Sequence, residues 1–388
     1  MTATIVSPRL MRIGGGSVGQ IAEVLGLFGL SRPLVVTDPW MLSSGTVNRC
    51  LDPLRAAGLS PEVFAETVPD PTDTVIEAGV AAFRAGDYDC LIGFGGGSPM
   101  DTAKAITILA AAAPGQKMRE FKVPASADRG AVPVICIPTT AGTGSEATRF
   151  TVITDTETDE KMLIAGLGAL PLAAIVDYEL TYSVPARTTA DTGIDSLTHA
   201  LEAYVSKRAN PHADSLALSA MRLIGRHLRI AYHQPKNAAA REAMMLGAMQ
   251  AGLAFSNSSV ALVHGMSRPL GAHFHVPHGL SNAMLLPAVT EFGLNDALPR
   301  YAEAARAIGV ATPEDADQVA GSKLLEELRA LNQELGVPTP KGHGIPAAKW
   351  EGLLPLMAKQ ALASGSPGNN PRVPTEAEII ALYRKMYG

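Results

Sequence analysis

The spacing of hydrophobic residues changes partway along the chain. Up to about residue 184, short apolar and β-branched runs alternate with stretches in which apolar residues recur every three or four positions. Strands are predicted at 32–38, 90–94, 132–138, 151–155 and 173–178, and helices at 46–57 and 73–85. Strands and helices in alternation predict a parallel sheet covered by helices on both faces.

After the stretch SVPARTTADTG at 183–193, the β-branched runs give way to segments rich in Ala, Leu and Met with helical spacing. We therefore expect two domains, an α/β domain with a parallel sheet at 1–185 and an all-helical domain at 186–388. A chain of 388 residues is long enough for both.

Composition and charge exclude several classes of protein. Hydrophobic residues make up 47% of the chain and charged residues 18%, which is typical of a globular protein and not of a disordered one. A net charge of −5 argues against nucleic acid and membrane surfaces as partners. Cys50, Cys90 and Cys136 are scattered and odd in number, so we expect reduced thiols in a cytoplasmic protein.

The stretch GFGGGSPMDTAKA at 93–105 follows an apolar strand and opens a helix. We expect Ser98 to cap this helix, Pro99 to be its first residue and Asp101 its third. The glycines at 95–97 would let the backbone approach a dinucleotide pyrophosphate at the helix N-terminus. The third glycine of the usual G-x-G-x-x-G pattern is replaced by Ser98, so a purely structural turn is an equal alternative.

Two further polar stretches follow predicted strands. Asp38 could accept hydrogen bonds from adenosine ribose hydroxyls, which would favour NAD over NADP, or it could simply end a strand. The loop PTTAGTGSEAT at 138–148 would lie at the carboxyl end of a parallel strand, where ligands bind in open α/β sheets. An ordinary surface loop is its alternative interpretation.

Candidate metal ligands occur in the helical half. Asp195 and His199, in GIDSLTHALEAY at 193–204, are four residues apart and thus share one helix face, although ordinary helical Asp–His pairs have the same spacing. Four of the nine histidines fall in HGMSRPLGAHFHVPHG at 264–279, at positions 264, 273, 275 and 278. Spacing alone does not select two of them. Three imidazoles and one carboxylate would suit Fe²⁺ or Zn²⁺.

These motifs, with FSNSSVALVHGMSRPLGAHFHVPHGLSNAMLLP and the closing GSPGNNPRVPTEAEIIALY, resemble the iron-dependent, or group III, alcohol dehydrogenases. Lactaldehyde and 1,3-propanediol oxidoreductases belong to that family, and the resemblance runs along essentially the whole chain. It implies a dehydroquinate synthase-like architecture, in which an α/β NAD-binding domain precedes a helical metal-binding and substrate domain. It also implies hydride transfer between NAD(H) and a small alcohol or its aldehyde, and a homodimer or larger homo-oligomer.

The resemblance also assigns residues. It implies that the metal, Fe²⁺ or alternatively Zn²⁺, is held by Asp195, His199, His264 and His278. The implied cofactor contacts are Asp38, Gly95, Gly96, Gly97, Ser98, Thr139, Thr140, Thr143, Ser145, Thr148, Lys161 and Leu180. The implied substrate and further catalytic positions are Phe150, Phe255, Arg149, His273 and Arg268.

Two positions depart from the family pattern. Much of the family has a histidine, often proposed as part of a proton path, where this chain has Arg268. Arginine does not titrate usefully, so water, His273 or His275 would have to relay the proton. Phe150 replaces an asparagine of some diol-specific relatives and would make a more apolar pocket wall. If Arg268 or Arg149 faces the substrate, that substrate would be an anionic hydroxy acid or semialdehyde.

Three other functions compete with this interpretation. A dehydroquinate synthase-like lyase shares the architecture but lacks the Asp-x-x-x-His helix. A hydroxyacid-oxoacid transhydrogenase would keep NAD bound and turn over without added NAD. A non-enzymatic binding protein on the same scaffold would be expected to lose the metal ligands, and all four are present here.

Overall fold

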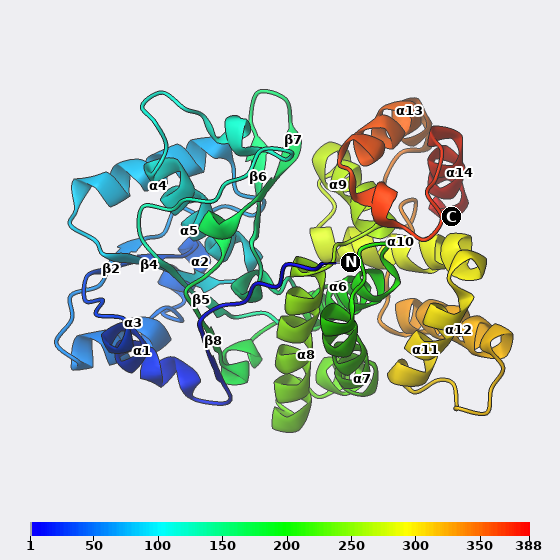
Figure 1. Cartoon of the computed structure of the whole chain (residues 1–388), viewed down its shortest axis with the longest axis horizontal. Helices are drawn as coiled ribbons and strands as arrows, with labels where there is room; N and C mark the ends of the chain where they lie inside the picture. Colours follow the sequence, from blue (N-terminus) through cyan, green and yellow to red (C-terminus); the bar gives the residue numbers. More distant parts are fainter. Residues whose placement is uncertain (1) are drawn as a thin grey trace. The chain divides into compact units, whose positions relative to one another are not determined.

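The computed structural model describes residues 2–388, which form two compact units. One unit comprises Val6–Ser183, and the other comprises Val184–Gly388 with the first residues of the chain up to Ile5. Figure 1 shows strands gathered in the first unit and helices throughout the second.

The first unit contains a six-stranded sheet in which every neighbouring pair is parallel, as expected. Its strand order is β1-β8-β5-β4-β2-β3. The strands are β1 (Leu10–Ile13), β2 (Pro33–Val36), β3 (Glu62–Phe64), β4 (Cys90–Gly95), β5 (Val134–Pro138) and β8 (Ala173–Val176). β2, β4, β5 and β8 are buried along their whole length, which explains their continuous apolar runs.

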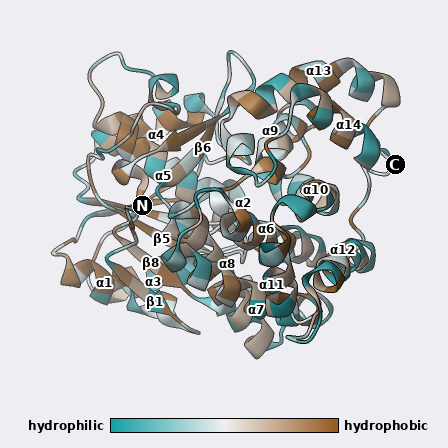
Figure 2. Cartoon of the chain, turned by 45° about the vertical axis from the view of Figure 1, so that its right-hand side comes forward, coloured by the Kyte–Doolittle hydropathy of each residue, from teal (hydrophilic) through white to brown (hydrophobic). Residues whose placement is uncertain are grey.

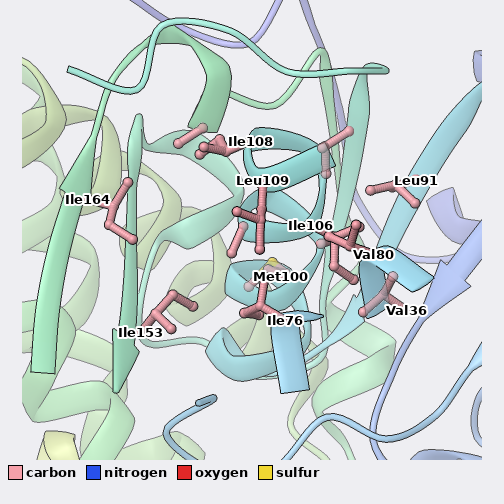
Figure 3. Close-up of a cluster of buried hydrophobic side chains, with 14 of the residues drawn as sticks. Val36, Ile76, Val80, Leu91, Met100, Ile106, Ile108, Leu109, Ile153 and Ile164 are labelled. Atoms are coloured by element: carbon pink, nitrogen blue, oxygen red, sulfur yellow. The ribbon is translucent and has the colours of Figure 1, made fainter. Parts of the chain in front are cut away.

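Helices cover both faces of this sheet because alternate strand side chains point to opposite faces. Leu34, Leu91 and Val134 pack with α4 (Asp73–Ala85) and α5 (Gly97–Ala110) in one core, part of which Figure 3 shows. Val35 and Ile92 pack on the other face with α1 (Ile21–Leu27) and α3 (Asn48–Ala56). A short helix, α2 (Pro39–Ser43), follows β2.

The strand predicted at 151–155 exists but does not belong to the parallel sheet. It is β6 (Phe150–Asp155), which pairs with β7 (Glu160–Ala165) in a separate antiparallel hairpin. Its side chains alternate between half-buried and buried, a pattern that suits a strand with one covered face. The buried side chains Ile153 and Ile164 reach the core beside α5 (Figure 3).

The second unit is all-helical, as predicted. Its helices are α6 (Ala186–Val205), α7 (Pro211–His233), α8 (Ala238–Ser256), α9 (Leu262–Phe274), α10 (His278–Gly293), α11 (Leu298–Ile308), α12 (Asp317–Glu334), α13 (Ala347–Ala363) and α14 (Glu376–Met386). α6 packs against α7, α8 and α10, and nearly all its residues from Thr189 onward are buried. Hydrophilic and hydrophobic residues mix along the outer α12, as its teal and brown ribbon in Figure 2 shows.

Within residues 2–388, no helix combines the length and apolar character that crossing a membrane would require. Cys50, Cys90 and Cys136 are all buried and free of disulfide bonds. This agrees with the reduced thiols expected from the sequence.

Candidate metal centre and cofactor loops

Four side chains of the helical unit converge on one point. α6 supplies Asp195 and His199, α9 supplies His264, and α10 supplies His278 at its first residue. One ligand atom from each lies within 4.8 Å of every other. The structure therefore brings together the four residues that the family resemblance selected, from three separate helices.

The spacing and chemistry of these atoms fit a divalent cation. Asp195 Oδ1 lies 3.8 Å from His199 Nε2, 3.6 Å from His264 Nε2 and 3.8 Å from His278 Nε2. A tetrahedral site with bonds of about 2.1–2.2 Å separates its ligands by about 3.4–3.6 Å, so the three distances from Asp195 Oδ1 are close to those around a bound ion. Three imidazole nitrogens and one carboxylate oxygen suit Fe²⁺ and Zn²⁺.

Glu202 holds His264 in the tautomer that a metal needs. Its carboxylate accepts hydrogen bonds from the backbone amides of Ala261 (2.9 Å) and Val263 (2.6 Å), and it lies 2.6 Å from His264 Nδ1. A hydrogen on Nδ1 leaves the lone pair of Nε2 directed at Asp195. Glu202 thus positions the ligand without being one.

Asn282, one helical turn after His278, contacts three of the four clustered side chains. Its side-chain nitrogen donates to Asp195 Oδ1 at 2.6 Å and lies 3.1 Å from His264 Nε2 and 3.2 Å from His278 Nε2. With one amide hydrogen donated to Asp195, the other faces the two ring nitrogens, an arrangement that suits unprotonated nitrogens, which is the state that binds a metal.

The electrostatics of the cluster favour a positive charge at its centre. Burial would raise the pKa of Asp195, but the three imidazoles around it hold that pKa well below its ordinary value. Burial likewise lowers the pKa of His264, but the carboxylates of Asp195 and Glu202 outweigh burial and raise it overall. Protons and a metal ion therefore compete for the same nitrogens, and metal binding will weaken as the pH falls.

Glu202→Gln is expected to weaken metal binding by about 10- to 100-fold, because it removes the charged acceptor that orients His264. The dissociation constant for Zn²⁺, measured by competition with a chromogenic chelator, tests this. Glu326→Gln, at an exposed position of α12, is the matched control. Equal Zn²⁺ affinity in Glu202→Gln and the wild type would show that Glu202 does not position the ligand.

The other candidate residues of the helical unit lie outside the four-residue cluster. His273 Nε2 is 2.7 Å from Gln360 Oε1, and His275 is exposed in a left-handed conformation (φ 54°) that ends α9. Phe255 is buried and stacks on His199, with 4.4 Å between ring centroids. Arg268 is half-buried and donates from Nη1 to Ser366 Oγ at 3.1 Å.

In the α/β unit, the glycine turn starts α5 two residues earlier than predicted. Gly97 is the first helical residue and Gly96 is the N-cap, so the prediction that Ser98 caps the helix was wrong. Gly95 (φ +147°) places the chain in a conformation that side chains rarely adopt, so the turn completes before Ser98. No side chain within residues 2–388 caps α5, so its first amides are available to a pyrophosphate.

The polar loop at 138–148 lies against the glycine turn at 95–97. The Thr139 amide donates to the Gly95 carbonyl at 2.8 Å, and a Cβ added to Gly97 would come within 2.8 Å of the Thr143 methyl group. Thr140 lies close to Gly96 in the same way. The Thr139 hydroxyl is buried and has no hydrogen-bond partner in the described chain, so a polar ligand group would satisfy it.

Lys104 anchors the far end of this loop. It is fully buried in α5, and its Nζ donates to the carbonyl oxygens of Ser145 (2.5 Å), Thr148 (3.0 Å) and Phe150 (3.0 Å). The hydroxyls of Ser145 and Thr148 lie 2.9 and 3.3 Å from the same nitrogen. These two predicted cofactor contacts are buried and hold Lys104.

Glu146, in the same loop, gives the fold a pH dependence. Burial raises its pKa from 4.5 to about 7, so the folded protein retains a proton that the unfolded chain releases at lower pH. Stability is therefore lost as the pH rises from about 4.5 to about 7. Glu146→Gln is expected to abolish this loss and to raise the free energy of unfolding at about pH 8 by up to about 3 kcal/mol. Urea unfolding at low and high pH measures both effects, and parallel curves for the two proteins would contradict them.

The remaining predicted site residues of the α/β unit contact other parts of the protein. Asp38 caps α2 by accepting from the Met41 amide at 2.9 Å, Lys161 pairs with Asp70 at 2.8 Å, and Leu180 lies in the core. The Arg149 guanidinium lies 5.9 Å from the centre of the Phe150 ring.

Sequence reasoning missed Glu202, Asn282 and Lys104. Glu202 is three residues after His199, and Asn282 is four after His278, so helical spacing from each ligand could have found them. Lys104 is flanked by Ala103 and Ala105 and followed by the apolar run of α5, which is the signal of a buried charge that needs partners.

Comparisons with known proteins bear on both units. The family model described as iron-containing alcohol dehydrogenase matches residues 8–178, and the model for the C-terminal part of the Fe-containing alcohol dehydrogenase family matches residues 189–387. Lactaldehyde reductase of Escherichia coli (strain K12) is 36% identical over 370 residues, covering 95% of this chain and 96% of the relative.

Solved structures of similar proteins match along the whole length. A 1,3-propanediol oxidoreductase has a TM-score of 0.94 at 35% identity, with 100% of both chains covered. Sulfoacetaldehyde reductase from Bifidobacterium kashiwanohense, solved in complex with NAD⁺, has a TM-score of 0.88 at 29% identity, covering 100% of this chain and 99% of that one.

Proposed function

We propose a role for each site residue of this chain, which belongs to the iron-containing alcohol dehydrogenase family and is therefore a metal-dependent, NAD-linked oxidoreductase of alcohols and aldehydes. The cluster of Asp195, His199, His264 and His278 holds Fe²⁺, with Zn²⁺ as the alternative. The observation that carries this assignment is the convergence of four ligand atoms within 4.8 Å inside one unit.

In the reductive direction, bound NADH would supply a hydride to the carbonyl carbon of the substrate, and a proton added to the oxygen would complete the alcohol, with NAD⁺ as the other product. A divalent cation supplies Lewis acidity, which polarises a carbonyl and lowers the pKa of an alcohol. The protein residues orient this chemistry. Glu202 fixes the His264 tautomer, Asn282 holds the Asp195 carboxylate, and Phe255 shields one face of His199 from water.

NAD(H) is bound by the α/β unit. The uncapped amides of α5 and the glycines at 95–97 take the pyrophosphate, with Thr139, Thr140 and Thr143 beside them. Asp38, at the end of β2, takes the adenosine ribose, which favours NAD over NADP. The remaining predicted contacts are Ser98, Ser145, Thr148, Lys161 and Leu180.

The substrate is a small alcohol or aldehyde, and its proposed contacts are Phe255 in the helical unit and Phe150 and Arg149 in the α/β unit. His273 and Arg268 complete the proposed catalytic residues. We place the enzyme in the cytoplasm as a homodimer or larger homo-oligomer. Three buried free cysteines support a reducing compartment, and β1 is an edge strand that a second copy could pair with.

Reduction of a panel of aldehydes by the Fe²⁺-loaded protein tests this function, with NADH and NADPH compared at equal concentration. We expect NADH oxidation that requires added cofactor and added metal. Turnover between a hydroxy acid and an oxo acid without added NAD would instead identify a transhydrogenase. No turnover with either Fe²⁺ or Zn²⁺ would overturn the enzymatic assignment.

A further inference from the structure

Arg268 carries a charge that no carboxylate of the described chain neutralises by an ion pair. The other half-buried arginines of the helical unit each form an ion pair with a carboxylate: Arg187 with Asp191, Arg229 with Glu327, Arg300 with Asp214 and Arg306 with Asp317. Within residues 2–388, no carboxylate lies within ion-pair distance of Arg268. It donates instead to the hydroxyl of Ser366, a neutral group.

The carboxylate of Glu202, which acts electrostatically on Arg268, is already bound to other groups. Glu202 acts on Arg268 only through its electric field, because its carboxylate binds His264 and the amides of Ala261 and Val263. Burial dominates and lowers the pKa of Arg268 to about 10, so the side chain stays protonated at neutral pH. A partly desolvated cation without a counterion costs free energy, which an anionic ligand would recover.

Arg268 is also placed beside the metal cluster. It is four residues after His264 on α9, so the two side chains share one helix face. Four residues of helix rise by about 6 Å, which a chain of about four carbon atoms can span. The turn that carries Ser366 packs against the same helix, because Pro367 fills the space beside Gly265.

We propose that Arg268 and Ser366 bind the anionic end of the substrate, so the enzyme acts on short aldehydes that carry a terminal carboxylate or sulfonate, and on the corresponding hydroxy acids. This inference rests on the proposed function, because the aldehyde end must reach the cluster of Asp195, His199, His264 and His278. A planar guanidinium with several donors suits two-pronged binding of such a group, and the Ser366 hydroxyl adds a further donor.

The kinetic test compares aldehydes of equal length with and without the charge. The Fe²⁺-loaded wild type is expected to reduce 4-oxobutanoate with a kcat/KM at least about 30-fold above that for butanal, since removing one partner of a desolvated charge pair typically costs this much or more. Arg268→Met should remove the preference, because its kcat/KM for 4-oxobutanoate should fall about 30-fold further than its kcat/KM for butanal. Arg268→Lys should restore part of it, and Arg226→Met, at an exposed position of α7, controls for net charge.

A binding measurement separates this inference from the proposed function. Titration calorimetry of 4-hydroxybutanoate into metal-free protein reports the anion contact without turnover, and Arg268→Met should weaken binding by about 30-fold. Reduction of butanal as fast as 4-oxobutanoate by the wild type would overturn the anionic substrate and keep the dehydrogenase. If Arg268→Met lowered kcat/KM equally for 4-oxobutanoate and butanal and left anion binding unchanged, the role of Arg268 would be structural. Tight, Arg268-dependent binding without reduction of any aldehyde would uphold the anion site and refute the dehydrogenase.

Discussion

Asp195→Asn is expected to lose the bound metal and to lower kcat/KM for aldehyde reduction by about 10³-fold or more. Asp195 is the only carboxylate among the four clustered ligands, and its Oδ1 lies within 3.8 Å of all three imidazole nitrogens. Asparagine has the same shape but brings no negative charge to balance the cation. The lost Lewis acidity is worth several kcal/mol in the transition state, and each 1.36 kcal/mol is tenfold in rate.

Metal content by mass spectrometry and steady-state kinetics measure these two effects on the same sample. Asp52→Asn, at an exposed position of α3 in the α/β unit, removes an equal charge without touching the cluster and should change neither quantity. Circular dichroism should show that Asp195→Asn keeps its helices. A variant that retains a full complement of metal and the wild-type rate would exclude Asp195 as a ligand.

Lys104→Met is expected to destabilise the α/β unit by about 3 kcal/mol or more. Lys104 is fully buried, and its ammonium group satisfies three backbone carbonyls that methionine cannot reach with a donor. Unpaired buried carbonyls each cost about 1–3 kcal/mol. At about 2–4 °C per kcal/mol for a unit of this size, the Tm of the unit should fall by about 6–12 °C.

The same substitution should weaken NAD(H) binding, because Lys104 fixes the loop that carries Thr139, Thr140 and Thr143. Calorimetric unfolding and NADH fluorescence titration measure the two effects. Lys117→Met removes an exposed lysine and serves as the control. If Lys104→Met lowered the Tm but left the dissociation constant for NADH unchanged, the loop would not belong to the cofactor site.

The sequence predicted the metal cluster only in part. Asp195 and His199 share a helix, so their juxtaposition follows from spacing alone. His264 and His278 could not be separated from His273 and His275 in this way, because the choice depends on where α9 ends and α10 begins. The left-handed His275 ends α9, and the following helix then presents His278 at its first residue.

The sequence predicts the buried strands of the parallel sheet, because full burial produces continuous apolar runs. It does not predict which strand Phe150–Asp155 pairs with. Fully buried runs such as Cys90–Gly95 and Val134–Pro138 gave parallel strands. The stretch Phe150–Asp155 is also rich in β-branched residues, with Thr151, Val152, Ile153 and Thr154, but it pairs with the neighbouring strand in a hairpin, which depends on the turn between them. Similarly, the start of α5 is set by the backbone conformation of Gly95 and not by the tendency of Ser98 to cap a helix.

The most direct test of the metal-dependent mechanism is an anaerobic titration of Fe²⁺ into metal-free, full-length protein, with the rate of NADH-dependent aldehyde reduction followed at each step. Four ligands that converge on one point predict a rate that rises in proportion to bound iron and stops at about one ion per chain. Metal-free protein that reduces aldehydes as fast as the loaded protein would contradict the role assigned to Asp195, His199, His264 and His278.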